Sequence, residues 1–248
     1  MSELFNFQPT LDTLIALAAG ATCLILSYLM LFFRRKTKRD KIANFLLRDF
    51  LMIFGLGVAF PLSYVVFAKG WALGQIGLTL HDWYLALAAN IGLAAFITLS
   101  FWKESPKKIK MFKFAPHAKS IFYIMVAGVF EVIFFYAFLR YYFELAFGAV
   151  FAIVLASAFY SLHHIGFESQ LWRSPRKELA KLFFVGIMFA TVFRIFNSAL
   201  AIYPFFWGVG AVYDVLIEKG ARGLPWKNAA ISSLLMIAFL TFLSLHIW

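Results

Sequence analysis

Ser120-Ile-Phe-Tyr-Ile-Met-Val-Ala-Gly-Val-Phe-Glu-Val-Ile-Phe-Phe-Tyr-Ala-Phe-Leu-Arg140 is a hydrophobic run long enough to cross a bilayer, with Glu131 near its middle. A carboxylate at that depth is costly unless it is paired, protonated or hydrated. An ionisable side chain inside a membrane segment therefore indicates a functional site. The next hydrophobic run supplies candidate partners, the adjacent histidines His163 and His164.

The composition of the whole chain indicates a membrane protein. Of its 248 residues, 63% are hydrophobic and only 14% are charged, which leaves too little polar surface for a water-soluble domain of this length. We expect one integral-membrane domain over residues 1–248. The single cysteine, Cys23, lies in a hydrophobic run, so the sequence offers neither a disulfide framework nor a cysteine-based zinc site.

Hydrophobic runs of about 17–25 residues recur along the chain, and each is long enough for a membrane helix. We predict an all-α, polytopic transmembrane helix bundle of about eight spans. The predicted spans are 10–33, 47–68, 83–102, 120–143, 147–165, 179–196, 198–216 and 229–247. The sixth and seventh spans almost touch, which requires a tight turn around Asn197.

The basic residues predict how this bundle is oriented. Twenty of the 23 lysines and arginines fall in the loops after the first, third, fifth and seventh spans or in the adjoining helix turns. Loops rich in lysine and arginine stay in the cytoplasm, so both termini are expected on the non-cytoplasmic side. The other side keeps only Lys69, Arg140 and Arg194, and we expect the two arginines to snorkel at helix ends.

The formal net charge of +11 follows from the same loops. No Gly-rich phosphate loop, helix-turn-helix pattern or basic patch interleaved with aromatic residues accompanies this charge, so no nucleic acid is expected as a partner. The expected partner is the lipid bilayer.

Counting residues along the helices places three ionisable side chains at similar depth. At about 1.5 Å per residue, Glu131 lies roughly 18 Å and His163 roughly 24 Å below the outer ends of their spans, and Asp214 matches His163. We therefore expect Glu131, His163 and Asp214 to share a polar pocket in the cytoplasmic half of the membrane. Glu131 and His163 should lie within about 8 Å, which leaves room for one water molecule. Because His163 and His164 are adjacent on a helix, only one of them is expected to point at Glu131.

Two short motifs on consecutive spans are similar to those of an intramembrane protease family. Glu131-Val-Ile-Phe-Phe-Tyr136 resembles an E-E-x-x-x-R motif, with valine in place of the second glutamate and tyrosine in place of the arginine. Phe159-Tyr-Ser-Leu-His163 matches an F-x-x-x-H motif on the next span. Over residues 70–216 the chain thus resembles the CAAX-endopeptidase and bacteriocin-processing family, called CPBP or Abi.

The third motif of that family departs further from this chain. It has a proline followed by a histidine and then an asparagine one turn later. After Pro204, the histidine position holds Gly208 and the asparagine position holds Val212.

The resemblance implies an intramembrane endopeptidase. No cofactor is expected. It implies that Glu131 is the general base and that His163 binds the attacking water or stabilises the oxyanion. The implied substrate is a prenylated, lipidated or leader-bearing peptide, cleaved near the cytoplasmic face of the membrane. From the residues alone, hydrolysis needs a base and oxyanion donors, and Asp214 and Tyr136 are further polar groups that could assist.

Each of these residues also has a structural alternative. Glu131 and His163 can form a neutralising buried pair that fixes helix packing, Asp214 can be a solvated interfacial group, and Tyr136 can be a packing residue. A metal site formed by Glu131, His163 and His164 is another alternative, although no H-E-x-x-H pair lies on one helix.

The departures from the motifs favour a further hypothesis, a family member that has lost catalysis and acts as a membrane scaffold or partner-binding subunit. A transporter would have inverted repeats, which the sequence does not show.

Overall fold

The computed structural model describes residues 7–36, 45–104, 106–110, 112–166 and 175–218, together with the short pieces 226–227, 230–231, 233–235, 238 and 242. Over these residues the protein is helical and contains no β-strand, so the predicted all-α class is confirmed.

Within the described residues, five helices are long and apolar enough to cross a membrane, as in an integral membrane protein. The first is α1 (Leu11–Lys36). The second is continuous over the π-helix η1 (Phe45–Ala59), α3 (Phe60–Ser63) and the π-helix η2 (Tyr64–Ala68). The third joins the 3-10 turn η4 (Ala115–His117), α6 (Ala118–Glu131), the π-helix η5 (Val132–Leu139) and α7 (Arg140–Phe147). The fourth is α8 (Ala149–His163) with the 3-10 turn η6 (His164–Gly166), and the fifth is α9 (Pro175–Phe196).

Two further apolar helices are shorter. α4 (Trp83–Glu104) is apolar over Trp83–Leu99, and α10 (Phe205–Glu218) is apolar over Phe205–Ile217. The short helix α5 (Pro106–Lys110) follows α4. The long and short apolar helices together correspond to the first seven predicted spans, whereas the eighth, 229–247, lies mostly outside the described residues.

The start of α10 differs from the prediction, because the helix begins at Phe205 rather than at residue 198. The chain first forms the 3-10 turn η8 (Ala199–Ala201). The buried Asn90 of α4 holds this turn: its side-chain nitrogen donates to the Leu200 carbonyl at 2.7 Å, and its side-chain oxygen accepts from the Phe206 amide at 2.7 Å. A side chain thus satisfies backbone groups that a continued helix would have paired internally.

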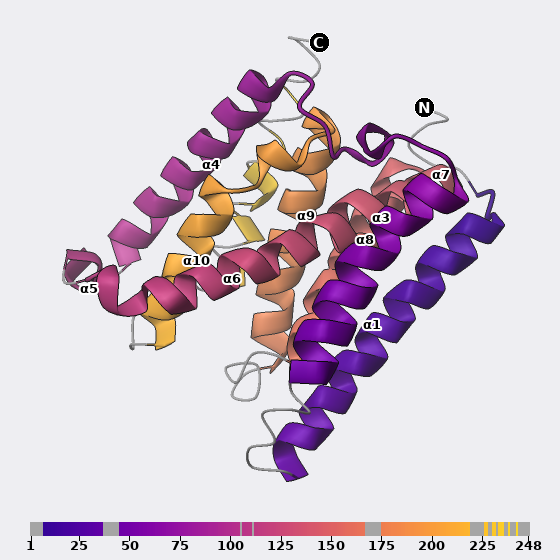
Figure 1. Cartoon of the computed structure of the whole chain (residues 1–248). Coiled ribbons are helices and arrows are strands. Elements are labelled where there is room, and N and C mark those ends of the chain that lie inside the picture. Colours follow the sequence, from indigo (N-terminus) through magenta and orange to yellow (C-terminus); the bar gives the residue numbers. More distant parts are fainter. Residues whose placement is uncertain are drawn as a thin grey trace.

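The helices form one bundle (Figure 1). α1 and the helix Phe45–Ala68 run side by side along one edge, and α4 lies at the opposite edge. α6 crosses the front of the molecule and packs on α10, which also contacts α4. The connection before α4 contains the 3-10 turn η3 (Leu73–Ile76) and packs on the turn before α10, where the Ala199 amide donates to the Gly77 carbonyl at 3.0 Å.

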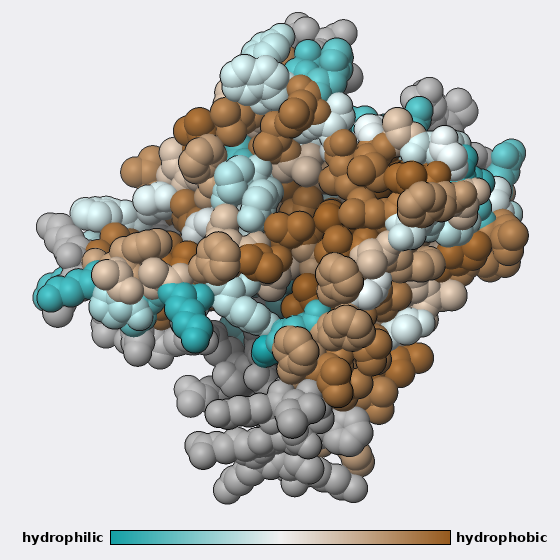
Figure 2. Space-filling model, viewed as in Figure 1, coloured by the Kyte–Doolittle hydropathy of each residue, from teal (hydrophilic) through white to brown (hydrophobic). Residues whose placement is uncertain are grey.

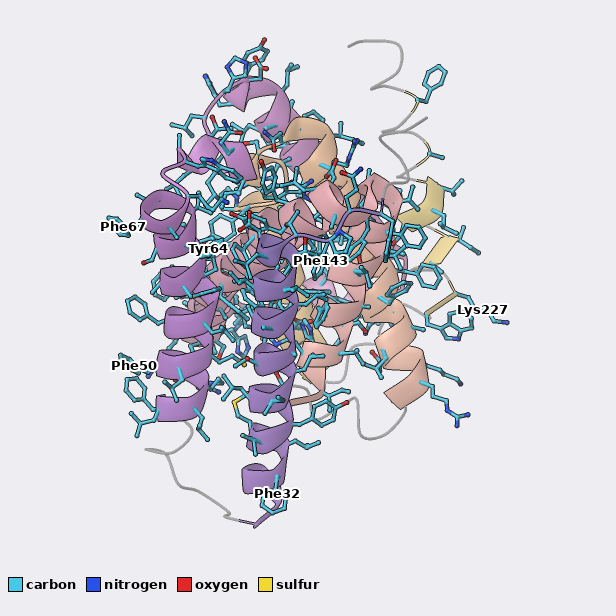
Figure 3. The ribbon with its side chains drawn as sticks, turned by 90° about the vertical axis from the view of Figure 1, so that its right-hand side faces the viewer. Phe32, Phe50, Tyr64, Phe67, Phe143 and Lys227 are labelled. Carbon is cyan, nitrogen blue, oxygen red and sulfur yellow. The ribbon has the colours of Figure 1, made fainter. Side chains whose placement is uncertain are left out.

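The face of the bundle seen in Figure 2 is apolar over wide areas. On the helix Phe45–Ala68, Phe50 and Phe67 point away from the bundle and are 53% and 84% exposed, whereas Tyr64 points inward (Figure 3). Large exposed apolar areas are unusual on soluble proteins and are expected where a helix faces lipid.

Arg140 is held inside the protein, so the prediction that it snorkels is wrong. Its side chain is 3% exposed, and its Nε donates to the Tyr136 carbonyl at 2.8 Å. It forms an ion pair with Glu144 one turn later, and Glu144 also accepts from Arg194 Nε at 2.8 Å. The Glu144 carboxylate neutralises the Arg140 guanidinium within the bundle, so this charge can stay buried without extending to the membrane surface.

Candidate functional site

Glu131 is the last residue of α6, and the π-helix η5 begins at the next residue. A π-helix pairs residues five apart, as in the bond from the Arg140 amide to the Phe135 carbonyl. Such segments inside α-helices are frequent at functional sites. The Glu131 side chain is only 14% exposed, so its carboxylate is held in the interior of the bundle.

Both histidines at the end of α8 reach Glu131. His163 Nε2 lies 3.6 Å and His164 Nε2 lies 3.9 Å from Glu131 Oε1. The prediction that Glu131 and His163 lie within about 8 Å is confirmed. The prediction that only one histidine points at Glu131 is wrong, because α8 ends at His163 and a 3-10 turn begins at His164. The two side chains therefore do not follow one helical periodicity.

The His164 imidazole is oriented by its own helix. Its Nδ1 lies 2.8 Å from the Tyr160 carbonyl oxygen. A carbonyl oxygen only accepts hydrogen bonds, so Nδ1 carries the hydrogen and Nε2 of neutral His164 presents its lone pair toward Glu131. The ring also packs edge to face on the Tyr160 ring and on the His163 ring, each at a centroid distance of 4.6 Å.

His163 is fixed by aromatic packing. Its side chain is 2% exposed, and its ring lies 5.5 Å from the Phe130 ring and 5.1 Å from the Phe135 ring. Both phenylalanines flank Glu131 in sequence, so the same stretch of helix carries the carboxylate and clamps the imidazole next to it.

The separations of 3.6 and 3.9 Å are longer than direct hydrogen bonds. Glu131 and neutral His164 both present acceptors to the space between them, which suits a water molecule that donates to both. A carboxylate in this position can take a proton from such a water. The arrangement is therefore able to activate water.

The same three side chains could hold a metal ion. Glu131, His163 and His164 each offer one ligand atom, and these atoms lie within 4.8 Å of one another. Catalytic zinc is commonly held by three such protein ligands, with water in the fourth position. The bond from His164 Nδ1 to a backbone carbonyl is also typical of imidazoles that bind metal.

Tyr136 lies behind this cluster. It follows Glu131 by five positions, which is the spacing that a π-helix pairs, so the two residues lie near the same face of η5. Its side chain is fully buried, and its ring lies 5.6 Å from the Tyr160 ring and 5.6 Å from the Phe189 ring. Since Tyr160 in turn packs on His164, Tyr136 supports the histidine from behind.

Asp214 is not brought into the cluster. It lies on the exposed side of α10, and its neighbour Val215 packs with Ile121 of α6. Ile121 precedes Glu131 by ten residues, or about 15 Å along a helix. The expected shared pocket does not include Asp214, because this part of α10 packs on the beginning of α6 rather than on its end at Glu131.

Gly128, one turn before Glu131, and Trp207, which packs on it, had no predicted role. A Cβ atom added to Gly128 would lie 2.1 Å from Trp207 Nε1, so the indole of α10 packs directly on the α6 backbone. Trp207 also stacks on Phe189 at 4.8 Å. Gly128 precedes Glu131 by three residues and lies on the same helix face. A glycine at this position was the sequence signal that another side chain could approach the α6 backbone closely.

α1 closes another side of the cluster. A Cβ atom added to Gly166 would lie 2.4 Å from the Ser27 carbonyl oxygen, so the end of η6 touches the α1 backbone. Cys23, one turn before Ser27, is fully buried. The positions of the third motif, Gly208 and Val212, instead line a separate apolar pocket.

Comparison of the chain with protein-family models, curated proteins and solved structures gave no match. The resemblance to the CPBP family therefore rests on the short motifs around Glu131 and His163.

Proposed function

We propose that this chain is an intramembrane peptidase in which Glu131 activates water and His163 is its partner. The observation that carries the proposal is the 3.6 Å separation of Glu131 Oε1 and His163 Nε2 inside a bundle whose helices are suited to a membrane. Peptide hydrolysis needs a base for the water and donors for the oxyanion. The buried carboxylate provides the base, and an imidazole N–H provides a donor.

In the proposed reaction, Glu131 takes a proton from a water molecule. His164 Nε2 accepts a hydrogen bond from the other O–H of that water and so orients it. The water oxygen bonds to the peptide carbon, and His163 stabilises the resulting oxyanion. Glu131 then returns the proton to the amide nitrogen as the C–N bond breaks, so the base becomes the acid. Tyr136 acts as a positioning residue through Tyr160 and His164.

The substrate class is proposed from the resemblance to the CPBP family. It is a prenylated, lipidated or leader-bearing peptide that is cleaved near the cytoplasmic face of the membrane. The cytoplasmic face is supported by the positions of 20 of the 23 lysines and arginines, which fall in every second loop between the predicted spans. The same distribution supports about eight spans with both termini on the non-cytoplasmic side.

Glu131→Gln tests the base directly. The full chain in liposomes is incubated with a mixed set of internally quenched farnesylated, acylated and leader-like peptides, and cleavage is followed by fluorescence and mass spectrometry. We expect cleavage by the natural chain and a loss of about 10²–10⁴-fold in Glu131→Gln, because the amide keeps the shape but cannot accept the proton. Glu178→Gln is the matched control, since Glu178 forms an ion pair with Lys181 at the start of α9. Unchanged cleavage by Glu131→Gln would rule out the base.

A second candidate function is a membrane scaffold or partner-binding subunit without catalysis. The observation that favours it is the packing at the positions of the missing motif residues, where Val132 is 3% exposed and Tyr136 is fully buried. If none of the peptides is cleaved by the natural chain, the scaffold is favoured. Glu131→Gln should then lower stability by about 1–3 kcal/mol and weaken association with a membrane protein partner.

A further inference from the structure

A pocket of about 500 Å³ opens between α4, α6 and α10. This volume lies within the range of about 300–1,000 Å³ that is usual for ligand sites. The lining is almost wholly apolar, and it includes Thr98, Ile121, Met125, Gly208, Val212 and Leu216. The contact between Trp207 and Gly128 lies between this pocket and Glu131 along α6, so the pocket is distinct from the candidate active site.

A group of lysines, here called the lysine corner, borders one end of the pocket. It consists of Lys107, Lys113 and Lys119, which are all exposed. Two residues of the same segment, Ile109 and Phe114, line the pocket. Hydrophilic side chains gather beside apolar ones at the α5 corner of the molecule (Figure 2).

The charge around this end of the pocket is positive. Residues 106–120 contain no acidic residue, and the described lysines of this segment are the three exposed ones of the lysine corner, whereas the described part of α10 contributes one exposed carboxylate, Asp214. Basic clusters next to membrane helices attract anionic lipid headgroups. The lining offers few polar groups, which disfavours a polar soluble ligand.

We propose that the pocket holds an acyl chain of an anionic phospholipid and that the lysine corner binds its phosphate. The apolar lining matches a hydrocarbon chain. The lysine stems can lie along apolar surface while their ammonium groups reach the headgroup. Two of the lining residues, Phe114 and Phe205, are 58% and 50% exposed, so the pocket reaches the surface of the bundle, where an acyl chain can enter. This site does not depend on the proposed peptidase activity.

The test uses the full chain in nanodiscs with phosphatidylglycerol or phosphatidylcholine that carries a photoactivatable diazirine in one acyl chain. Adducts are mapped by mass spectrometry. We expect adducts at Met125, Val212 or Leu216 and a preference for phosphatidylglycerol. Lys113→Gln and Lys119→Gln should each lower phosphatidylglycerol labelling about fivefold and leave phosphatidylcholine labelling unchanged. Lys177→Gln is the control, because Lys177 is exposed at the start of α9.

Filling the pocket gives a second, independent variant. Gly208 lies 3.5 Å from Met125 Sδ, measured from an added Cβ atom, so Gly208→Leu should occupy the pocket and abolish its adducts with both lipids. Gly210→Leu on the same helix is the control, because an added Cβ atom meets nothing within 4 Å there. Absence of adducts in the pocket would overturn the proposal, as would equal labelling by the two lipids, which would indicate bulk lipid only.

Discussion

At the scale of the residue, the Tyr160 carbonyl decides which nitrogen of His164 faces Glu131. The 2.8 Å contact places a hydrogen on Nδ1, and in neutral His164 it leaves Nε2 as an acceptor 3.9 Å from the carboxylate. A water molecule that donates to both groups, or a cation, suits such a pair of acceptors. The proposed reaction uses a water molecule in that position, whereas a metal ion would give the same three residues the role of ligands.

Chelation separates these two chemistries. We predict that 1,10-phenanthroline leaves peptide cleavage unchanged, because the proposed base and its two imidazoles activate water without a cation. The non-chelating isomer 1,7-phenanthroline is the matched control for binding of the aromatic compound itself. Cleavage that stops only with the chelator and returns on addition of zinc would assign Glu131, His163 and His164 to a metal site instead.

The sequence predicted the pairing of Glu131 with His163 because both positions follow from helix rise and from the short loop between two long helices. It did not predict that His164 joins them. That outcome depends on where α8 changes to a 3-10 turn, and the apolar sequence around Ser161 and Leu162 carries no signal for this change.

At the scale of the element, the contact between α6 and α10 depends on a single missing side chain. Gly128→Leu would place its Cβ atom 2.1 Å from Trp207 Nε1, and Trp207 cannot move freely because it stacks on Phe189 at 4.8 Å. We predict a loss of about 1–3 kcal/mol in stability from this overpacking. Thermal unfolding in detergent measures it, with Gly210→Leu as the control. Equal melting temperatures for the two variants would contradict the packing described for Trp207.

The long helices were predictable, and their internal details were not. Runs such as 10–33 and 47–68 match α1 and the helix Phe45–Ala68 because length and apolarity alone define a membrane helix. The π-helix after Glu131 left no signature, since Val132–Leu139 is buried on every side and has no polar face to define a period. The late start of α10 was missed because Asn90, distant in sequence, holds the preceding turn.

At the scale of the whole molecule, the charge distribution makes the proposed topology testable. Cys23 is fully buried, so a Cys23→Ala background removes the native thiol from labelling experiments. We predict that a single cysteine at Ser2 reacts with a membrane-impermeant maleimide in intact cells, whereas one at Ser105 reacts only after the cells are permeabilised. Labelling of both from the same side would contradict the topology.

In the proposed peptidase, Glu131 and His163 act as one catalytic unit, and a double-mutant cycle on peptide cleavage measures whether they do. Glu131→Gln and His163→Asn are compared singly and together, with the same peptide and the full chain in liposomes. We predict that each single variant loses about 10²–10⁴-fold and that the double variant is no slower than the slower single one, because residues that act as a unit are not additive. Losses that multiply in the double variant, or a single variant that cleaves at the natural rate, would contradict the claim.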